Sequence, residues 1–467
     1  MKIKKISVAG LFGSVDHEIN LRQDEPTLVL APNGAGKTHL LRLTAAALSL
    51  DARVLLNTPF KTLVVTFDDD QLLRVDSALS ESNDPIVAFS SSRGHSQATA
   101  DKHPKLIVVA TETTRVDRRG ITVDADPVFQ WSNSASGREY NLQDDRAAPG
   151  GIRKVSGAMR RSRRSVEVLS EDFPQIANLT GDPRPIFIDT WRLDLRAAEQ
   201  EFLGDWGRAP LWDNSSAASR IRDYTEKLRL EITEARRSSI RKTQSADLSF
   251  AARALEAANL TVRESTLHER YNKTVETYEA LAENGLAIGE SPLPFPEKSS
   301  PTVRRILNVF LDDWDERLKP LLPVNRKLQV LREILDSKLA PSGKKTKISD
   351  QGRLSFVNSN NKSLPESHLS SGEQHLIALF TSLLFVAKTN SLVLIDEPEI
   401  SLHAAWKHAF LEDISRVADI NGLQIVLATH STGIINGRWD LAEELELQID
   451  ENDPVEDAIG EDEEIEE

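Results

Sequence analysis

Apolar and polar positions alternate along the N-terminal part of the chain. Residues 4–21 and 62–76 carry this alternation, which is typical of strands with one buried face, and the acidic run at 68–70 indicates a hairpin turn. Short apolar runs predict buried strands at 26–32, 184–194, 391–398 and 423–431, with further strands within 106–128 and 346–359. Helical spacing predicts helices at 36–50, 372–388 and 404–419.

A long helical segment interrupts this pattern. Residues 216–285 are rich in Ala, Glu, Arg and Leu, with breaks expected near Ser245 and Asn259. A Pro-rich stretch separates them from a further helical stretch at 302–338. Strand, helix and strand then follow in turn, which predicts an α/β fold: a mixed sheet with a parallel core and an inserted helical lobe. The expected parts are 1–200 and 341–440 (the two parts of the α/β body), 201–340 (the helical lobe) and 441–467 (an acidic, disordered tail).

Length and composition fit a soluble protein with more than one lobe. The chain has 467 residues, of which 39% are hydrophobic and 28% are charged. It contains no cysteine, which excludes disulfides, thiolate metal sites and thiol nucleophiles. No apolar run approaches the ~18 residues that a membrane span needs, and no signal peptide opens the chain, so we expect a cytoplasmic protein without a membrane partner.

The net charge of −15 is concentrated at one end of the chain. Residues 443–467 hold 14 acidic residues and no Lys or Arg, and the remaining chain is close to charge balance. Such a tail is either a solvated, disordered end or a segment that docks on a basic surface.

Residues 31–38, A-P-N-G-A-G-K-T, have the pattern of a phosphate-binding loop between a strand and a helix. Ala31 replaces the first Gly of the G-x-x-x-x-G-K-[ST] consensus, which is acceptable if its φ stays negative. Glycines let backbone amides cradle phosphate oxygens, Lys37 reaches the β- and γ-phosphates, and Thr38 ligates Mg²⁺. The expected nucleotide contacts are Asn33, Gly34, Ala35, Gly36, Lys37, Thr38 and His39.

Two apolar strands end in residues suited to phosphate hydrolysis. Asp396 and Glu397 close the first strand, where an Asp can hold Mg²⁺ and the next acid can polarise the attacking water. His430 closes the next strand, and parallel strands would bring it to the same sheet edge. It could there bond a γ-phosphate or the attacking water. Acids at strand ends can instead cap a following helix, and a lone His can be structural.

Residues 368–379, H-L-S-S-G-E-Q-H-L-I-A-L, resemble the signature motif of ABC-type ATPases in the form found in SMC, RecF and OLD-family proteins. Leu369, Ser370, Gly372, Glu373 and Gln374 match, and Ser371 replaces the first signature Gly. Ser370 and Glu373 also have the spacing of a capping box, so a well-capped helix is the simpler interpretation.

The motifs follow the order of that group: phosphate loop, signature, acidic strand end and histidine strand. The resemblance implies an ATPase that uses ATP and Mg²⁺ in a homo-oligomer with shared sites. Ser370, Ser371, Gly372 and Glu373 would contact nucleotide bound by another subunit, and Lys37, Glu397 and His430 would be catalytic. Ser401 and His403 are expected near the subunit seam, and the glutamine of the family's Q-loop has no clear counterpart, Gln130, Thr190 and Arg192 being candidates.

Three functions compete at this level. The compact insertion resembles the stand-alone ATPases of bacterial antiphage systems such as PARIS or Septu, which implies a sensor that controls a separate effector, for example a nuclease. The alternative is a DNA-repair ATPase like RecF or SMC, because Arg115, Arg118, Arg119 and the basic cluster at 153–164 could contact phosphates, unless they are solvated loop residues. A transporter ATPase fits less well, since the insertion is long.

Overall fold

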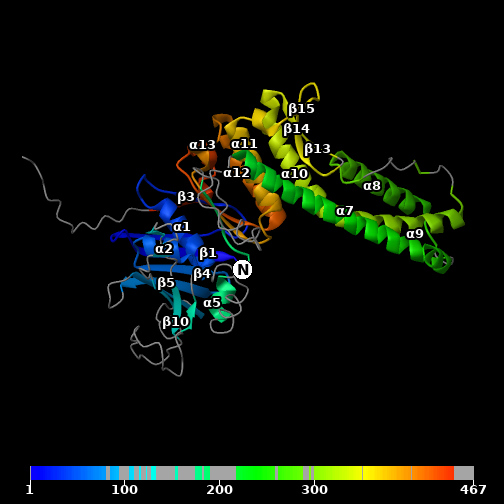
Figure 1. The fold of residues 1–467 in the computed structure, drawn as a ribbon. Helices are drawn as coiled ribbons and strands as arrows, with labels where there is room; N and C mark the ends of the chain where they lie inside the picture. The colour runs from blue at the N-terminus through cyan, green and yellow to red at the C-terminus, as the bar shows by residue number, and fades with distance from the viewer. Residues whose placement is uncertain are drawn as a thin grey trace, which may run out of the picture. The chain divides into compact units, whose positions relative to one another are not determined.

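The computed structural model divides the chain into two compact units. The first contains residues 1–23, 27–184 and 442–467, and the second contains residues 24–26 and 185–441. The structure describes residues 2–79, 85–93, 105–109, 115–116, 122–123, 128–132, 153–155, 174–180, 183–189, 217–257, 261–287, 294–295, 299–349, 351–400 and 402–445. Figure 1 labels the helices and strands of both units.

The first unit contains an eight-stranded sheet in the order β11-β10-β7-β6-β5-β4-β1-β2, and every neighbouring pair is antiparallel. Its strands are β1 (Ile3–Leu11), β2 (Val15–Asn20), β4 (Thr62–Phe67), β5 (Gln71–Leu79), β6 (Pro85–Arg93), β7 (Lys105–Val109), β10 (Val128–Ser132) and β11 (Arg153–Val155). A separate short pair joins β8 (Arg115–Val116) to β9 (Thr122–Val123). The alternation in the sequence thus predicts β1, β2, β4 and β5 correctly, with the acidic run at 68–70 as the turn between the last two.

The phosphate-loop segment of this unit is held by a second, parallel strand pair. β3 (Thr27–Leu30) leads into α1 (Lys37–Ser49), which is followed by α2 (Ala52–Asn57), and α5 (Pro174–Leu179) lies later in the chain. β3 pairs with β18 (Ala442–Glu444), and the Leu445 N–H donates to the Leu30 carbonyl at 2.8 Å.

The start of the acidic tail, expected at residue 441, is therefore wrong. Residues 442–444 belong to the fold, because their backbone pairs with β3 and the side chain of Leu445 is only 2% exposed. The rest of the tail, residues 446–467, lies outside the described residues, and its state stays a prediction.

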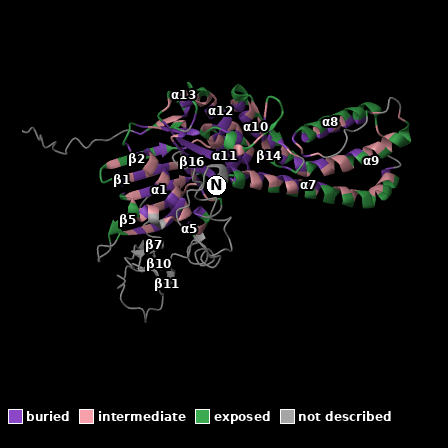
Figure 2. Cartoon of the chain, turned by 45° about the horizontal axis from the view of Figure 1, so that its top comes forward, coloured by how far each residue is buried: buried purple, intermediate pink, exposed green. Residues whose placement is uncertain are grey.

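The second unit contains the expected parallel strands. β12 (Ile186–Asp189), β16 (Leu392–Asp396) and β17 (Gln424–Ala428) are parallel and adjacent in this order. Every residue of β16 and β17 is buried (purple in Figure 2), as expected for strands covered on both faces. The elements around them are α11 (Ser371–Phe385), η6 (Pro398–Ile400), α12 (Ala404–Asn421), α13 (Thr432–Ile435) and η7 (Trp439–Leu441).

The expected helical lobe is also part of this unit. It consists of α7 (Ala217–Glu256), α8 (Glu264–Glu283), α9 (Pro301–Leu318), η3 (Lys319–Leu321), α10 (Leu322–Leu339) and η4 (Ala340–Ser342). The chain then forms β13 (Lys344–Ile348), β14 (Leu354–Asn358), β15 (Ser363–Leu364) and η5 (Glu366–His368) before it reaches α11. The long helix α7 packs against both α9 and α11.

One prediction about these helices is wrong. α7 continues through Ser245, and a contact with another helix holds the part beyond it: Arg253 donates to Asp313 of α9. The helical stretch predicted at 302–338 is confirmed, and within it α9, η3 and α10 meet at Pro320 and Pro323, which lack the amides that one continuous helix would need. The break near Asn259 is confirmed by the end of α7 and the start of α8.

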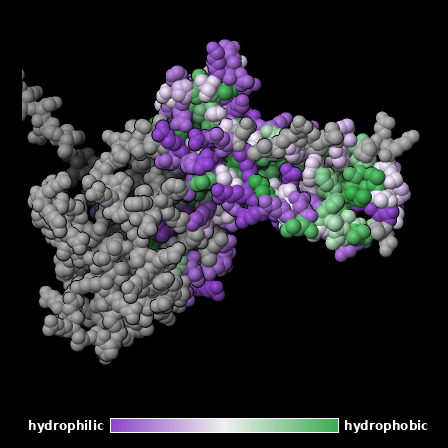
Figure 3. Space-filling model, turned by 45° about the vertical axis from the view of Figure 1, so that its right-hand side comes forward, coloured by the Kyte–Doolittle hydropathy of each residue, from purple (hydrophilic) through white to green (hydrophobic). Residues whose placement is uncertain are grey.

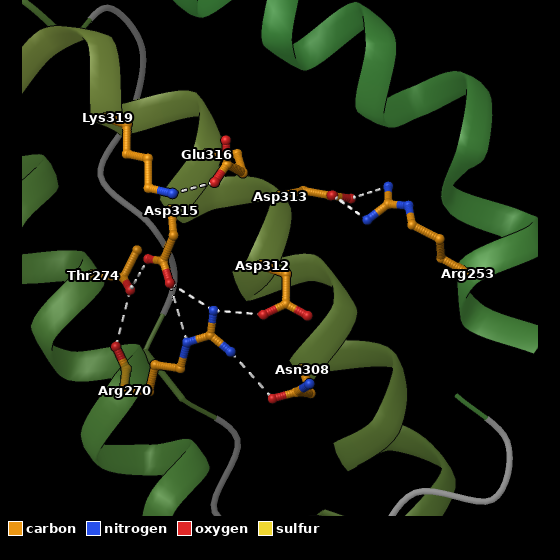
Figure 4. A network of polar contacts seen from close by, with 9 residues as sticks. All are labelled: Arg253, Arg270, Thr274, Asn308, Asp312, Asp313, Asp315, Glu316 and Lys319. Carbon is orange, nitrogen blue, oxygen red and sulfur yellow. Dashed lines mark hydrogen bonds and ion pairs between the residues drawn. The ribbon is translucent and has the colours of Figure 1, made fainter. Parts of the chain in front are cut away.

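Ion pairs tie the helices of the lobe together (Figure 4). The guanidinium of Arg270 on α8 lies 2.7 Å from Asp312 and 2.6 Å from Asp315, both on α9. Arg253 of α7 holds Asp313 on the same helix with two hydrogen bonds. α9 is therefore fixed to both of its neighbours by carboxylates, in addition to the apolar cluster of Leu267, Tyr271 and Leu311.

Within this unit, a buried ion pair joins the lobe to α12, the helix between β16 and β17. Lys338 Nζ on α10 lies 2.6 Å from Asp413 Oδ2 on α12, and each side chain is only 9% exposed. Burial raises the pKa of Asp413, although the ion pair with Lys338 opposes the shift.

Apolar side chains gather at the end of the lobe that α7, α8 and α9 form (Figure 3). On α7, Leu248 is 92% exposed and Leu255 is 77% exposed. Among the described helices, none is long and apolar enough to cross a membrane.

Candidate functional site

The loop between β3 and α1 has the backbone shape of a phosphate cradle. Gly34 and Gly36 have φ angles of 85° and 86°, in the left-handed region that glycine adopts at low cost. A Cβ atom on Gly36 would lie 2.7 Å from Leu11 Cδ2, so the Leu11 side chain would have to shift to admit one. Ala31 keeps a negative φ, as its place in the motif requires.

Lys37 lies inside this loop. Its side chain is 5% exposed, and its ammonium donates to the carbonyls of Ala31 at 2.9 Å and Pro32 at 3.3 Å. The N-cap residue of α1, Gly36, offers no side-chain bond to the first turn, and no acidic residue occupies that turn. The start of α1 therefore presents backbone amides and a lysine charge together, which is the arrangement that binds anions.

Three aromatic side chains, from β2, from the turn before it and from α1, contact or flank the loop. His17 on β2 is 4% exposed and donates from Nε2 to the Ala35 carbonyl. Phe12 has a φ of 53° and is 48% exposed, and its ring meets that of His39 edge-on at 4.8 Å. Burial, followed by the charge of Arg42, lowers the pKa of His39. Sequence reasoning named His39 but missed Phe12 and His17, although the L-F-G-S turn before β2 is a usable signal for the former.

In the second unit, the predicted acids lie at the carboxyl end of β16, between two parallel neighbours. Asp189 of β12 is in register with Asp396 of β16, which is in register with Ala428 of β17. Asp396 is 5% exposed, and Glu397 follows it at the edge of the sheet. The chain end of β17 lies beside these acids, which confirms that Glu397 and His430 share one sheet edge.

Glu397 has a strained backbone. Its φ of 44° is left-handed, which is uncommon for a residue with a side chain and costs about 1–3 kcal/mol. Its N–H donates to the Ala428 carbonyl at 2.8 Å, so pairing with β17 holds the residue in place. Its Oε1 atom lies 3.6 Å from Nε2 of His430. Strained residues of this kind cluster where a side chain must be aimed.

A further acid links the two strand ends. Oε1 of Glu399, in η6, accepts hydrogen bonds from the Thr429 hydroxyl at 2.8 Å and the His430 N–H at 2.7 Å. Sequence reasoning missed Glu399, although the D-E-P-E run places a second carboxylate two residues after Glu397.

The capping box at the start of α11 is confirmed. The Glu373 N–H donates to Ser370 Oγ at 3.3 Å, and the Ser370 N–H donates to Glu373 Oε2 at 2.7 Å. Glu373 is buried and also accepts from Ser342 at 2.9 Å and Lys344 at 2.7 Å. Burial alone would raise its pKa, but the bonds from Lys344, Ser370 and Ser342 outweigh it and lower the pKa.

Glu373, one of the four signature residues expected to contact nucleotide, therefore bonds residues of its own chain, including Ser370. Ser370 and Ser371 are exposed, and Gly372 is half-buried. Gln374 donates to the carbonyls of Glu366 and Leu369, which fixes the loop before the helix.

The loop residues 33–39 belong to the first unit, and Asp396, Glu397, His430 and the signature belong to the second. Of the other candidates, Gln130 lies on β10 and His403 is the N-cap of α12. Thr190, Arg192 and Ser401 lie outside the described residues, as do Arg118, Arg119 and residues 156–164.

Solved structures of SMC heads are similar to this chain, at low TM-scores. "Crystal structure of the SmcHead bound to the C-winged helix domain of ScpA" is 12% identical, covers 93% of this chain and 91% of that chain, and has a TM-score of 0.31. The SMC head domain from Thermotoga maritima is 9% identical, covers 95% and 93%, and has a TM-score of 0.29. The Smc head domain with a coiled coil and joint from Pyrococcus yayanosii is 12% identical, covers 93% of each chain, and has a TM-score of 0.27. Likeness at this level supports no inference about function.

A family model gives a firmer result. None of the curated proteins matches the chain. The model described as "AAA domain, putative AbiEii toxin, Type IV TA system" matches residues 138–436, which is more than half of the chain and includes the signature, the acidic strand end and His430. The chain therefore belongs to this family of AAA domains.

Proposed function

We propose that this AAA-type protein binds ATP with Mg²⁺ and hydrolyses it. The observation that carries the proposal is the loop around Lys37: two left-handed glycines, an uncapped helix start and a buried ammonium. The ammonium now bonds neutral carbonyls of the loop. Phosphate oxygens are stronger, charged acceptors, so nucleotide binding would draw Lys37 from Ala31 and Pro32 to the phosphates.

The side chains named from the sequence as metal ligands suit Mg²⁺. Thr38 offers a hydroxyl and Asp396 a carboxylate, both hard oxygen ligands, and we propose from the motif order that they hold the ion. When bound, Mg²⁺ neutralises charge on the phosphates. Glu397 polarises the attacking water, and His430, at 3.6 Å from Glu397, helps to orient that water or the γ-phosphate. The exposed ring of Phe12, close to His39 after the loop, offers a surface for the base.

We further propose that two copies of the chain share each site. Ser370 and Ser371 are exposed at the start of α11, where the capping box occupies the Glu373 N–H and leaves the two Ser hydroxyls at the surface. These residues would contact nucleotide held by the loop of the second copy. Glu373 would act indirectly, by holding Ser370.

Complementation between two inactive variants tests this sharing. Lys37→Ala removes the loop's charge, and Ser370→Arg blocks the signature. Each variant alone should be inactive, but a mixture should recover activity, since a pair of unlike copies contains one intact site. Activity per protomer of the wild type should also rise with protein concentration. A mixture that stays inactive, together with wild-type activity that is independent of concentration, would contradict a shared site.

The finer part of the proposal concerns what the ATPase controls. We propose a regulator of a separate effector, such as a nuclease, in antiphage defence, as in the PARIS and Septu systems that the motif order resembles. The family description, with its toxin and toxin–antitoxin terms, is compatible with this role. The exposed apolar residues at the end of the lobe, Leu248 and Leu255 among them, are candidates for the effector's docking surface.

DNA repair remains the alternative function. Because most of its basic residues lie outside the described residues, a binding experiment must decide. DNA affinity that falls steeply with salt would favour it, and a nuclease co-purifying with the chain in the absence of DNA would favour the effector role.

A further inference from the structure

Glu399 connects the turn that follows Glu397 to the segment that carries His430. Its Oε1 atom accepts from the Thr429 hydroxyl at 2.8 Å and from the His430 N–H at 2.7 Å, across 30 positions of sequence or more. Thr429 is fully buried, and its hydroxyl oxygen accepts in turn from the Ser431 N–H at 3.0 Å. All three residues from 429 to 431 are thus bound to one carboxylate oxygen, directly or through one atom.

A second hydrogen bond joins the same two segments, with donor and acceptor exchanged. The Glu397 N–H donates to the carbonyl of Ala428, which fixes the acid to the end of β17. Glu399 fixes the next residues of that chain to η6. Together these hydrogen bonds restrict the movement of His430 away from Glu397. Nε2 of His430 lies 3.6 Å from Oε1 of Glu397 in this arrangement.

We propose that Glu399 is a positioning residue, which holds His430 against Glu397 for hydrolysis. This inference rests on the proposed ATPase function. Glu399 accepts from the backbone N–H of His430, so it acts by placing the residue. Small displacements of a catalytic group are enough to slow a reaction about 100-fold.

Two variants test this role, and they differ in whether residue 399 keeps a side-chain oxygen. Glu399→Ala removes the carboxylate, whereas Glu399→Gln keeps a side-chain oxygen that can accept both bonds. Glu399→Ala should lower kcat roughly 10- to 100-fold with little change in KM for ATP, and Glu399→Gln should recover most of the rate. Glu412→Ala, at an exposed acid on α12, is the matched control and should leave kcat unchanged. Equal kcat in Glu399→Ala and wild type would overturn the role.

A double-mutant cycle with His430→Ala separates positioning from general support of the fold. If Glu399 acts through His430, Glu399→Ala should slow the His430→Ala variant by less than about twofold. If the fold reductions in kcat of the two single variants multiply in the double variant, Glu399 acts independently of His430 and the proposal is overturned.

Hydrogen exchange gives a test that needs no activity. Without nucleotide, Glu399→Ala should speed exchange of the His430 amide about tenfold or more, and Glu399→Gln should speed it less. If Glu399→Ala does not fold, Thr429→Val, which removes one donor, should still speed exchange at residues 430 and 431. Unchanged exchange in the folded variants would contradict the link. An inactive wild type would refute the proposed function, and exchange would still report on Glu399.

Discussion

His430 Nε2 lies 3.6 Å from Glu397 Oε1, although the two residues follow different strands and are separated by the whole of α12. The contact exists because β16 and β17 are parallel neighbours in register, so their carboxyl ends coincide. An acid of strained backbone is thus paired with an imidazole at one sheet edge. This pairing is the basis of the first prediction.

Glu397→Gln should abolish turnover and retain ATP binding. The amide keeps the shape and the hydrogen bonds of the side chain but cannot accept a proton from water, so kcat should fall at least about 100-fold. The assembled, ATP-bound form should then accumulate, because hydrolysis no longer resolves it. Single-turnover hydrolysis and size-exclusion chromatography with ATP measure the two effects, and full turnover would remove Glu397 from this role.

Lys37→Ala should weaken ATP binding about 10- to 100-fold, because the variant loses a charge-assisted contact to the phosphates. Lys37→Met, which preserves volume at this buried position, should behave similarly and excludes a simple packing defect. Lys4→Ala, at a half-exposed lysine of β1, serves as the control. Calorimetric titration with a non-hydrolysable ATP analogue measures the affinity, and an unchanged value would argue against the loop as the phosphate site.

Phe12→Ala should raise the Kd for ATP about 3- to 10-fold if the ring stacks on the base. Inorganic triphosphate has no base, so its Kd should not change. Trp439→Ala, at an aromatic residue 56% exposed in the second unit, is the control. A loss of affinity for both ligands would show that Phe12 supports the loop through His39 instead.

Lys338→Met should destabilise the second unit by about 3–5 kcal/mol, because it leaves Asp413 as a buried charge without its partner. The double variant Lys338→Met with Asp413→Leu should recover most of that loss, since an apolar pair needs no compensation. Hydrogen exchange of α10 and α12 peptides measures the opening free energy. A double variant no more stable than Lys338→Met alone would contradict this account.

The raised pKa of Asp413 gives a pH dependence of known sign. The folded protein binds the carboxyl proton of Asp413 more tightly than the unfolded chain does. Protonation of Asp413 therefore makes its full contribution to the free energy of unfolding below the unfolded pKa of about 3.9. It is lost as the pH rises through the folded pKa. As the pH rises from 3.5 to about 7, the free energy of unfolding of the wild type should therefore fall relative to that of Asp413→Asn. Urea titrations at several pH values measure this change. A constant difference would mean that Asp413 titrates normally.

Local motifs were predictable because their geometry depends on adjacent residues. The left-handed Gly34 and Gly36, the helix start at Lys37 and the capping box of Ser370 and Glu373 involve positions at most three apart. The parallel strands were predictable for the same reason, since continuous apolar runs need cover on both faces. The pairing of Glu397 with His430 followed once the two strands were placed as neighbours.

Consecutive residues were sufficient to predict the phosphate loop, the acidic strand end and the histidine strand. The distant partners of the long-range contacts could be identified only in the folded chain. Glu399 reaches Thr429, Lys344 reaches Glu373, α7 runs unbroken past Ser245 against α9, and residues 442–444 join β3. In each case a partner far along the chain supplies the stabilising bond, and local propensity carries no information about distant partners.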